Sequence, residues 1–220
     1  MSTRAAFLAM LLIPAAASAQ PDPSPEARAG LEQALKGFPP LIVGGNVHAS
    51  AAEAAVPRAC PAAGGRVEQK GGPTLEFLGS DPQNPALCRM KVGPDTLDAW
   101  YGIWATAWPG AASAQRGLER LMHGKTGDVV GFDTVATPGT QWHDLIRQDG
   151  VEEISLLGKT YRAVKLAHYR EGFGGTGDRS VSTVWKDLET GLPMYRTYQH
   201  IAGQPDLDDP LIPTAIVPGD

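Results

Sequence analysis

Short segments in which apolar and polar residues alternate dominate the C-terminal half of this chain, and they constrain its fold more than any other feature. A period of two predicts strands with one buried face, and the Gly, Pro and Asp residues between segments predict turns. Because no segment of helical period separates them, we expect successive strands to pair antiparallel. The six segments are 129–134, 141–147, 151–157, 160–170, 180–188 and 194–201.

Two of the predicted turns are tight. Only Gly158 and Lys159 separate segments 151–157 and 160–170. A two-residue hairpin loop with Gly first favours a type II′ turn. Glu189-Thr190-Gly191 predicts the next turn, because Gly is free to adopt a positive φ there.

The stretch before these segments carries less regular signals. Residues 74–78 and 87–92 are short apolar runs that predict strands. Residues 97–108 fit either a helix or a strand, and their aromatic content favours a strand. Ala111–Met122 has an apolar stripe at helical spacing and is followed by Gly124, which predicts one amphipathic helix.

These patterns predict an α+β fold. We expect a curved, half-barrel-like antiparallel sheet of about eight to ten strands, packed by one main helix over 111–122. Ser24 and Pro25 fit the start of a further short helix in an N-terminal extension. The expected division is a signal peptide, an N-terminal helix with an Ala/Pro/Gly-rich linker, a single β-rich domain and a Pro/Asp-rich tail, over 1–19, 20–64, 65–203 and 204–220.

The first nineteen residues have the pattern of a cleavable secretory signal. Arg4 supplies the basic start, residues 5–13 the apolar core, and Ala17-Ser18-Ala19 the small-residue cleavage site. The apolar core is shorter than the about 20 residues that span a bilayer. We therefore predict a periplasmic or secreted protein with no transmembrane segment after cleavage.

The cysteine count agrees with export. Cys60 and Cys88 are the only two cysteines, and an even count in an exported chain predicts a disulfide. Their separation rules out a C-x-x-C redox motif, so the predicted bond is structural. The formal charge of −5, without a Lys/Arg cluster, argues against nucleic acid as a partner.

One glycine-rich stretch contains a literal G-x-G-x-x-G. A dinucleotide site needs this motif between a strand and a helix, so that helix-terminal amides face the pyrophosphate. Here the motif lies between two segments that predict antiparallel strands, which favours a hairpin loop able to move over a ligand. The candidate gating residues are Gly172, Gly174, Gly175 and Gly177.

No local motif predicts a metal, a cofactor or a catalytic residue. The histidines lack the close spacing that assembles a metal site within one element. No G-x-S-x-G elbow is present. The scattered histidines are His48, His123, His143, His168 and His200.

Large aromatic side chains are the candidate ligand contacts. Core packing is one explanation for them. The other is that some line a concave apolar face, because ligand pockets are mostly apolar and aromatic. The candidates are Trp100, Tyr101, Trp104, Trp108, Trp142 and Trp185.

Residues 152–201 carry a further pattern. It comprises Gly158-x-Thr-Tyr161, Ala163-Val-Lys-Leu166, Thr183-Val-Trp185-x-Asp187 and Thr190-Gly-Leu-Pro193. This run is similar to the closing strands of the LolA/LolB periplasmic lipoprotein carriers and of related uncharacterised envelope β-domains. The resemblance implies a curved antiparallel sheet, closed by a helix, that shelters acyl chains.

Three hypotheses of function follow. The leading one is non-catalytic binding of an apolar ligand, such as a lipid or the acyl chain of a lipoprotein. The second is an envelope hydrolase whose site is assembled from His143, His168 or His200 with Asp133 or Asp187. The third is a structural or protein-interaction module with an exposed strand edge or apolar patch. The absence of a catalytic motif favours a binding protein over an enzyme.

Overall fold

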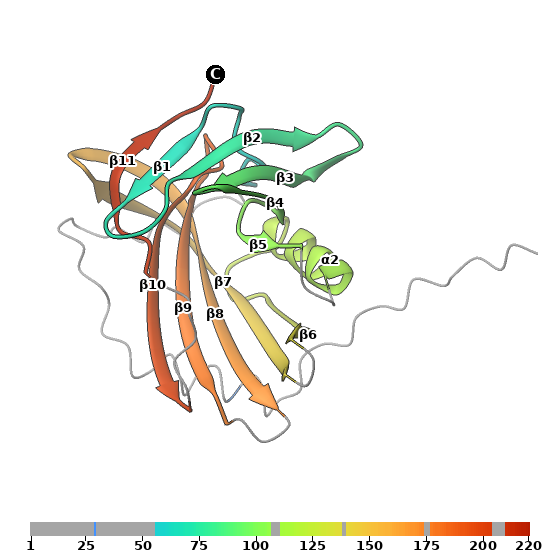
Figure 1. Ribbon diagram of the computed structural model, residues 1–220. Helices are drawn as coiled ribbons and strands as arrows, with labels where there is room; N and C mark the ends of the chain where they lie inside the picture. The colour runs from blue at the N-terminus through green and yellow to red at the C-terminus, as the bar shows by residue number, and fades with distance from the viewer. Residues whose placement is uncertain (1–28, 30–55, 107–110, 138–139, 174–176, 204–209) are drawn as a thin grey trace, which may run out of the picture.

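The computed structural model of the protein describes residues 29, 56–106, 111–137, 140–173, 177–203 and 210–220 (Figure 1). The signal segment, the expected N-terminal helix and most of the expected linker lie outside these residues. Within them every strand pairing is antiparallel, and the strands form two sheets. The sequence predicted the antiparallel, sheet-rich plan with one main helix; the division into two sheets instead of one is new.

The first sheet has six strands in the order β11-β1-β2-β3-β4-β5. Its last strand in sequence comes from the predicted Pro/Asp-rich tail and pairs with the first strand of the domain, so the end of the chain adds an edge to this sheet. The strands are β1 (Arg66–Gln69), β2 (Leu75–Asp81), β3 (Asn84–Val92), β4 (Asp95–Trp100), β5 (Trp104–Ala105) and β11 (Pro213–Val217).

The second sheet has five strands in the order β10-β9-β8-β7-β6, each paired with its neighbour in sequence. This up-and-down succession is the one that the alternating segments predicted. Figure 1 shows its long strands curving past the helix and below the first sheet. The strands are β6 (Val129–Thr137), β7 (Thr140–Leu156), β8 (Lys159–Phe173), β9 (Arg179–Asp187) and β10 (Pro193–Ala202).

Segments 141–147 and 151–157, expected as two strands, form the single strand β7. The register with β8 shifts between Gln148 and Gly150, which marks a β-bulge. Gly150 has a φ of 95°, a conformation that Gly adopts without strain. A bulge bends a strand without ending it, so a glycine that resembles a turn signal in sequence produces curvature instead.

The hairpin after β7 differs from the predicted type II′ turn. Leu156 pairs with Lys159, so the two loop residues are Leu157 and Gly158. Both have a positive φ, 53° and 77°, which identifies a type I′ turn. Leu157 therefore occupies a position that normally selects Asn, Asp or Gly.

The ambiguous stretch 97–108 begins as a strand, as expected, but then reverses. Tyr101 and Gly102 have positive φ values of 55° and 69°, and Ile103 N–H donates to the Trp100 carbonyl. This turn brings Trp104 opposite Trp100 in the pair β4–β5. The two tryptophans therefore lie on neighbouring strands of a tight hairpin and not on one continuous strand.

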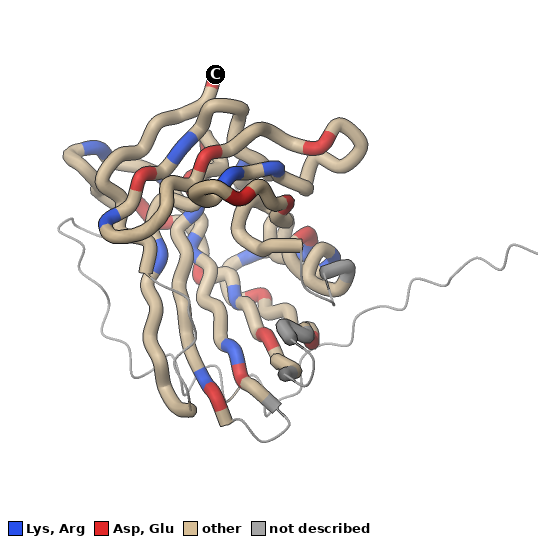
Figure 2. Tube along the Cα trace, viewed as in Figure 1, with Lys and Arg blue, Asp and Glu red and all other residues tan. Residues whose placement is uncertain are grey.

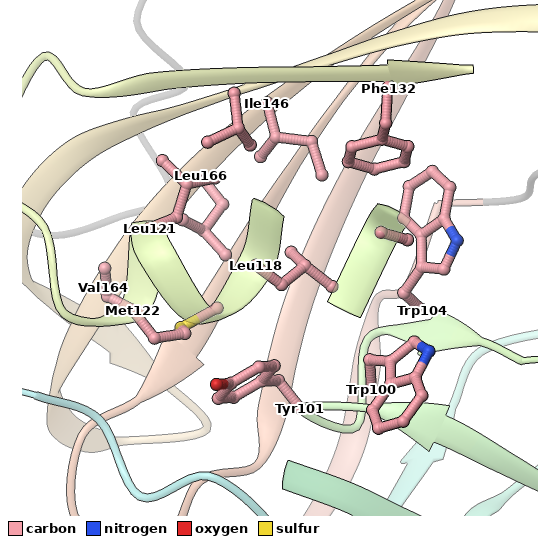
Figure 3. Packing of buried hydrophobic residues seen from close by; sticks show 12 residues of the cluster. Trp100, Tyr101, Trp104, Leu118, Leu121, Met122, Phe132, Ile146, Val164 and Leu166 are labelled. Carbon is pink, nitrogen blue, oxygen red and sulfur yellow. The ribbon is translucent and has the colours of Figure 1, made fainter. Parts of the chain in front are cut away.

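The helix α2 covers Ala111–Met122, as predicted. Leu118 and Leu121 are fully buried between the first sheet and the second, next to Trp104, Phe132 and Ile146 (Figure 3). Burial of one such leucine stabilises the fold by about 1.5–3 kcal/mol. We call the face of the second sheet that packs on α2 the helix-side face.

A second apolar cluster joins the two sheets away from α2. Val67 and Phe77 of the first sheet pack with Leu192 and Met194, which lie before and in β10. All four are fully buried. The two sheets are therefore held together at two places, one on each side of the β4–β5 hairpin.

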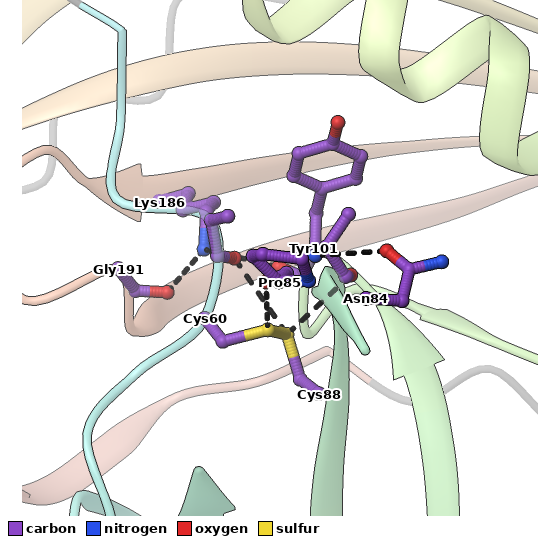
Figure 4. Close-up of a disulfide and its surroundings, with 9 residues drawn as sticks. Cys60, Asn84, Pro85, Cys88, Tyr101, Lys186 and Gly191 are labelled. Atoms are coloured by element: carbon purple, nitrogen blue, oxygen red, sulfur yellow. Dashed lines mark hydrogen bonds between the residues drawn. A yellow bond between two sulfur atoms is a disulfide. The ribbon is translucent and has the colours of Figure 1, made fainter. Parts of the chain in front are cut away.

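The predicted disulfide between Cys60 and Cys88 is present and ties the segment before β1 to β3 (Figure 4). It is consistent with an oxidising compartment outside the cytoplasm. Basic and acidic residues are interspersed along the strands of both sheets in Figure 2. No helix in the described ranges has the length and apolar character needed to cross a membrane.

A buried lysine lies beside the disulfide. Lys186 is completely inaccessible, and its ammonium donates hydrogen bonds to the carbonyls of Ala59, Tyr101 and Gly191. These carbonyls belong to the N-terminal segment, the β4–β5 turn and the β9–β10 turn. One side chain thus holds three separate backbone segments together.

Candidate functional site

The aromatic side chains predicted as ligand contacts are all buried where the structure describes them. Trp100, Tyr101 and Trp104 belong to the α2 cluster, and Trp185 lies in the cluster between the sheets. None of these side chains is more than 9% exposed, and Trp142 is equally buried. Trp108 lies outside the described residues. A ligand role for this set stays a prediction.

The structure instead reveals a groove between the two sheets. It has a volume of about 590 Å³, within the range of about 300–1,000 Å³ that is typical of small-molecule sites. One wall comes from β2, β3 and β4, through Leu75, Met90 and Leu97. The opposite wall comes from the second sheet, where Val184 of β9 and Arg196 of β10 form a cross-strand pair.

The chemistry of the groove is mostly apolar. Ile103 and Ala105, on either side of the buried Trp104, line it from the β4–β5 hairpin, and Leu211 lines it from the segment before β11. Its only charged lining residues among the described ones are Lys70, on the exposed loop between β1 and β2, and Arg196. Among its described lining residues, the groove therefore combines mostly apolar walls with two basic side chains.

A buried ionic cluster lies on the helix-side face next to this groove. Asp144 is fully buried and accepts hydrogen bonds from Thr134 Oγ1 at 2.6 Å, Arg170 Nε at 2.8 Å and His168 Nε2 at 2.8 Å. A carboxylate can only accept from the imidazole, so His168 carries its proton on Nε2. Its Nδ1 then faces the Ser182 hydroxyl at 3.4 Å.

The partners of Asp144 decide its protonation. Burial alone raises the pKa of Asp144, but the hydrogen bond and charge of His168 and the charge of Arg170 outweigh it and hold the pKa below its usual value. Arg170 also lies over the rings of Trp104 and Trp142, at 5.5 and 5.3 Å from their centroids. Asp144 is thus enclosed by its three hydrogen-bond donors, and two tryptophans lie against the guanidinium of Arg170.

Of the residues proposed for a hydrolase, His143 and Asp133 are in contact, whereas His168 and Asp187 bind other partners. His143 pairs with Asp133 at 2.7 Å on the face opposite to Asp144, because successive strand residues point to opposite faces. His168 binds Asp144 and neither of the two carboxylates named in that hypothesis. Asp187 accepts from the backbone and hydroxyl of Thr190 and shapes the β9–β10 turn.

The glycine-rich stretch joins β8 to β9, two antiparallel strands, as the sequence predicted. Gly172 is the last but one residue of β8, and its N–H donates to the Asp178 carbonyl at 2.8 Å. Gly177 has a φ of 62°. Gly174 and Gly175 lie outside the described residues, and the gating role of this loop stays a prediction.

Sequence reasoning missed both the groove and Asp144. The sequence pattern predicts which residues of a strand share one face, but it does not predict how two sheets pack, and the groove lies between two sheets. In the sequence, Asp144 is only the neighbour of His143, and their side chains lie on opposite faces of β7.

Among the described residues no group of three His, Cys, Asp or Glu side chains gathers as metal ligands would. Comparisons with protein-family models, curated proteins and solved structures found no match to this chain.

Proposed function

We propose that this protein binds an apolar chain, such as a lipid or acyl chain, in the groove between its two sheets. The groove is the observation that carries the proposal, because a space of about 590 Å³ with mostly apolar walls has the size and chemistry of a site for an apolar ligand. Burial of a hydrocarbon chain there gains about 25 cal/mol for each Å² of apolar surface removed from water.

The resemblance of residues 152–201 to the lipoprotein carriers supports the same role. In that reading the five-stranded sheet is the curved half-barrel, and the first sheet with α2 closes it. The signal-like N-terminus and the disulfide between Cys60 and Cys88 support an envelope or secreted location. A carrier or binding protein of the periplasm is the corresponding biological role.

Competition binding tests the proposal with a matched pair of variants. Leu97 lines the groove, and Leu97→Trp should fill part of it. Leu78, on β2 of the same sheet, is 37% exposed and does not line the groove, so Leu78→Trp is the control. The probe is the uncharged dye N-phenylnaphthylamine, with dodecanol as competitor.

The wild type and Leu78→Trp should bind the dye with one saturable site and release it to dodecanol. Leu97→Trp should weaken binding by roughly tenfold or more, the equivalent of about 1.4 kcal/mol. Thermal unfolding of both variants controls for a general loss of structure. Equal binding by the two folded variants, or no binding by the wild type, would exclude the groove as the site.

A further inference from the structure

We propose that the ligand carries an anionic head group, phosphate or carboxylate, and that polar side chains on the helix-side face of β8, β9 and β10 bind it beside the groove. This inference rests on the proposed function, because it extends the same ligand beyond its apolar chain. It assigns a second part of the site and a ligand class, an anionic amphiphile.

The polar side chains form two neighbouring rows across the sheet. Strand pairing places Tyr198 beside Ser182 and Ser182 beside His168 in the first row. In the second row, His200 lies beside Ser180, which lies beside Arg170. Arg170 in turn lies beside Asp144. Cross-strand pairs share a face, so these side chains all point to the side of the sheet on which α2 packs.

The first row adjoins the groove directly. Val184 and Arg196, which line the groove, are one cross-strand pair, and Ser182 and Tyr198 are the next pair on the same face. Two residues along a strand correspond to about 6.6 Å. The β4–β5 hairpin flanks both parts of the site, because Ile103 and Ala105 line the groove while the ring of Trp104, on the other face of the hairpin, lies 5.0 Å from that of His168.

Several polar atoms in or beside these rows lack a partner. Ser180 is 8% exposed, and its hydroxyl makes no hydrogen bond within the described residues. Nδ1 of His200 and Nε1 of Trp142 are buried without a partner in the same part of the chain. More than about 90% of buried polar groups in proteins are hydrogen-bonded, so the two buried atoms of His200 and Trp142 on one sheet face indicate a polar ligand.

The charges of the surrounding residues favour an anion. Asp144 is the only acidic residue in the two rows, and Arg170, His168 and Thr134 already satisfy it. Lys70, on the exposed loop between β1 and β2, adds positive charge at the adjoining groove. Hydroxyl and imidazole groups donate hydrogen bonds well to phosphate and carboxylate oxygens. A second acidic group in this place would instead have favoured a cation.

Three probes separate the two parts of the site. Dodecyl phosphate has the chain and an anionic head, dodecanol has the chain alone, and inorganic phosphate has the head alone. Isothermal titration of the wild type should give the tightest binding with dodecyl phosphate, weaker binding with dodecanol, and no measurable binding with inorganic phosphate.

The variants Ser180→Ala and His200→Phe remove the unpartnered groups. Each should weaken dodecyl phosphate binding by about tenfold, as expected for the loss of a hydrogen bond to a charged group, and leave dodecanol binding unchanged. Gln199→Ala is the control, because Gln199 is exposed on the opposite face of β10. It should change neither affinity.

The outcomes distinguish this inference from the proposed function. If both alkyl probes bind equally, or if the two variants leave dodecyl phosphate unaffected, the groove stands and the head-group site is overturned. If inorganic phosphate binds alone and depends on His200, the site takes a free anion and the amphiphile is overturned. If neither alkyl probe binds, the proposed function fails and this inference fails with it.

Discussion

Replacement of the buried Lys186 by methionine is the perturbation whose effect the structure defines best. Methionine fills a similar volume but donates no hydrogen bond, so the carbonyls of Ala59, Tyr101 and Gly191 lose the lysine as their donor. Each buried carbonyl left unpaired costs about 1–3 kcal/mol, and removal of a buried charge recovers part of that sum. We expect Lys186→Met to lower the free energy of unfolding by about 3 kcal/mol at neutral pH.

The same lysine predicts a dependence of stability on pH. Burial lowers the pKa of Lys186 to about 7, with Asp187 opposing the fall and Arg58 adding to it. An unfolded lysine titrates at about 10.4, so above about pH 7 the unfolded chain binds one more proton than the folded chain. Stability due to this group therefore rises with pH, by about 2 kcal/mol between about pH 7 and pH 9. Lys186→Met should lack that increment.

Urea unfolding, followed by tryptophan fluorescence at both pH values, measures these differences. Lys165→Met is the matched control, because Lys165 lies on the neighbouring strand, is only partly buried, and has its ammonium 5.5 Å from the centroid of the Trp185 ring. An exposed contact of this kind is worth about 0.5–1 kcal/mol, so the control should remain close to the wild type. A Lys186→Met protein as stable as the wild type, with the same pH dependence, would refute the role given to this side chain.

Three further changes test other parts of the fold. Leu157→Asn should raise the free energy of unfolding by about 1 kcal/mol in thermal or urea unfolding, because Asn-Gly suits the type I′ turn that Leu157 and Gly158 now form; an unchanged or lower stability would contradict that turn. Replacement of Cys60 and Cys88 together by alanine should lower the free energy of unfolding by about 3.5 kcal/mol relative to the oxidised wild type, because the unfolded chain gains loop entropy. A loss below about 1 kcal/mol would argue against the disulfide as a major constraint. Asp144→Ala should lower the free energy of unfolding by about 3–5 kcal/mol at neutral pH, since it leaves a buried cation without its anion. The wild type should lose this stabilisation as the pH falls below about 4, where the carboxylate becomes protonated in the unfolded chain. If the variant and the wild type lost stability equally in acid, the cluster would not be coupled to folding.

The sequence predicted those parts of the fold that local patterns specify. The six alternating segments became the second sheet, and Ala111–Met122 became α2 with the expected bounds. Predictions from local patterns were wrong at residues whose backbone conformation differs from the one that their residue type favours. Gly150 bends β7 although a glycine there suggests a turn, and Leu157 has a positive φ that its side chain disfavours.

The candidate site was less predictable for a different reason. The groove arises where Leu97 of one sheet faces Val184 of another, and the relative placement of two sheets depends on long-range packing. The ionic cluster joins Thr134, Asp144 and Arg170 from three strands, so it is defined only once the strand register is known. Aromatic content alone pointed to the tryptophans, and the structure places Trp100, Trp104 and Trp185 in the apolar clusters.

The groove between the sheets is the feature on which the proposed function depends, and methyl NMR of the protein with added dodecanol tests it most directly. The methyl resonances of Met90, Leu97 and Val184 should shift in a saturable manner, because these side chains line the groove. Those of Leu118 and Leu121, on the buried face of α2, should stay in place. Shifts confined to the α2 cluster, or no shifts at any methyl group, would contradict ligand binding between the two sheets.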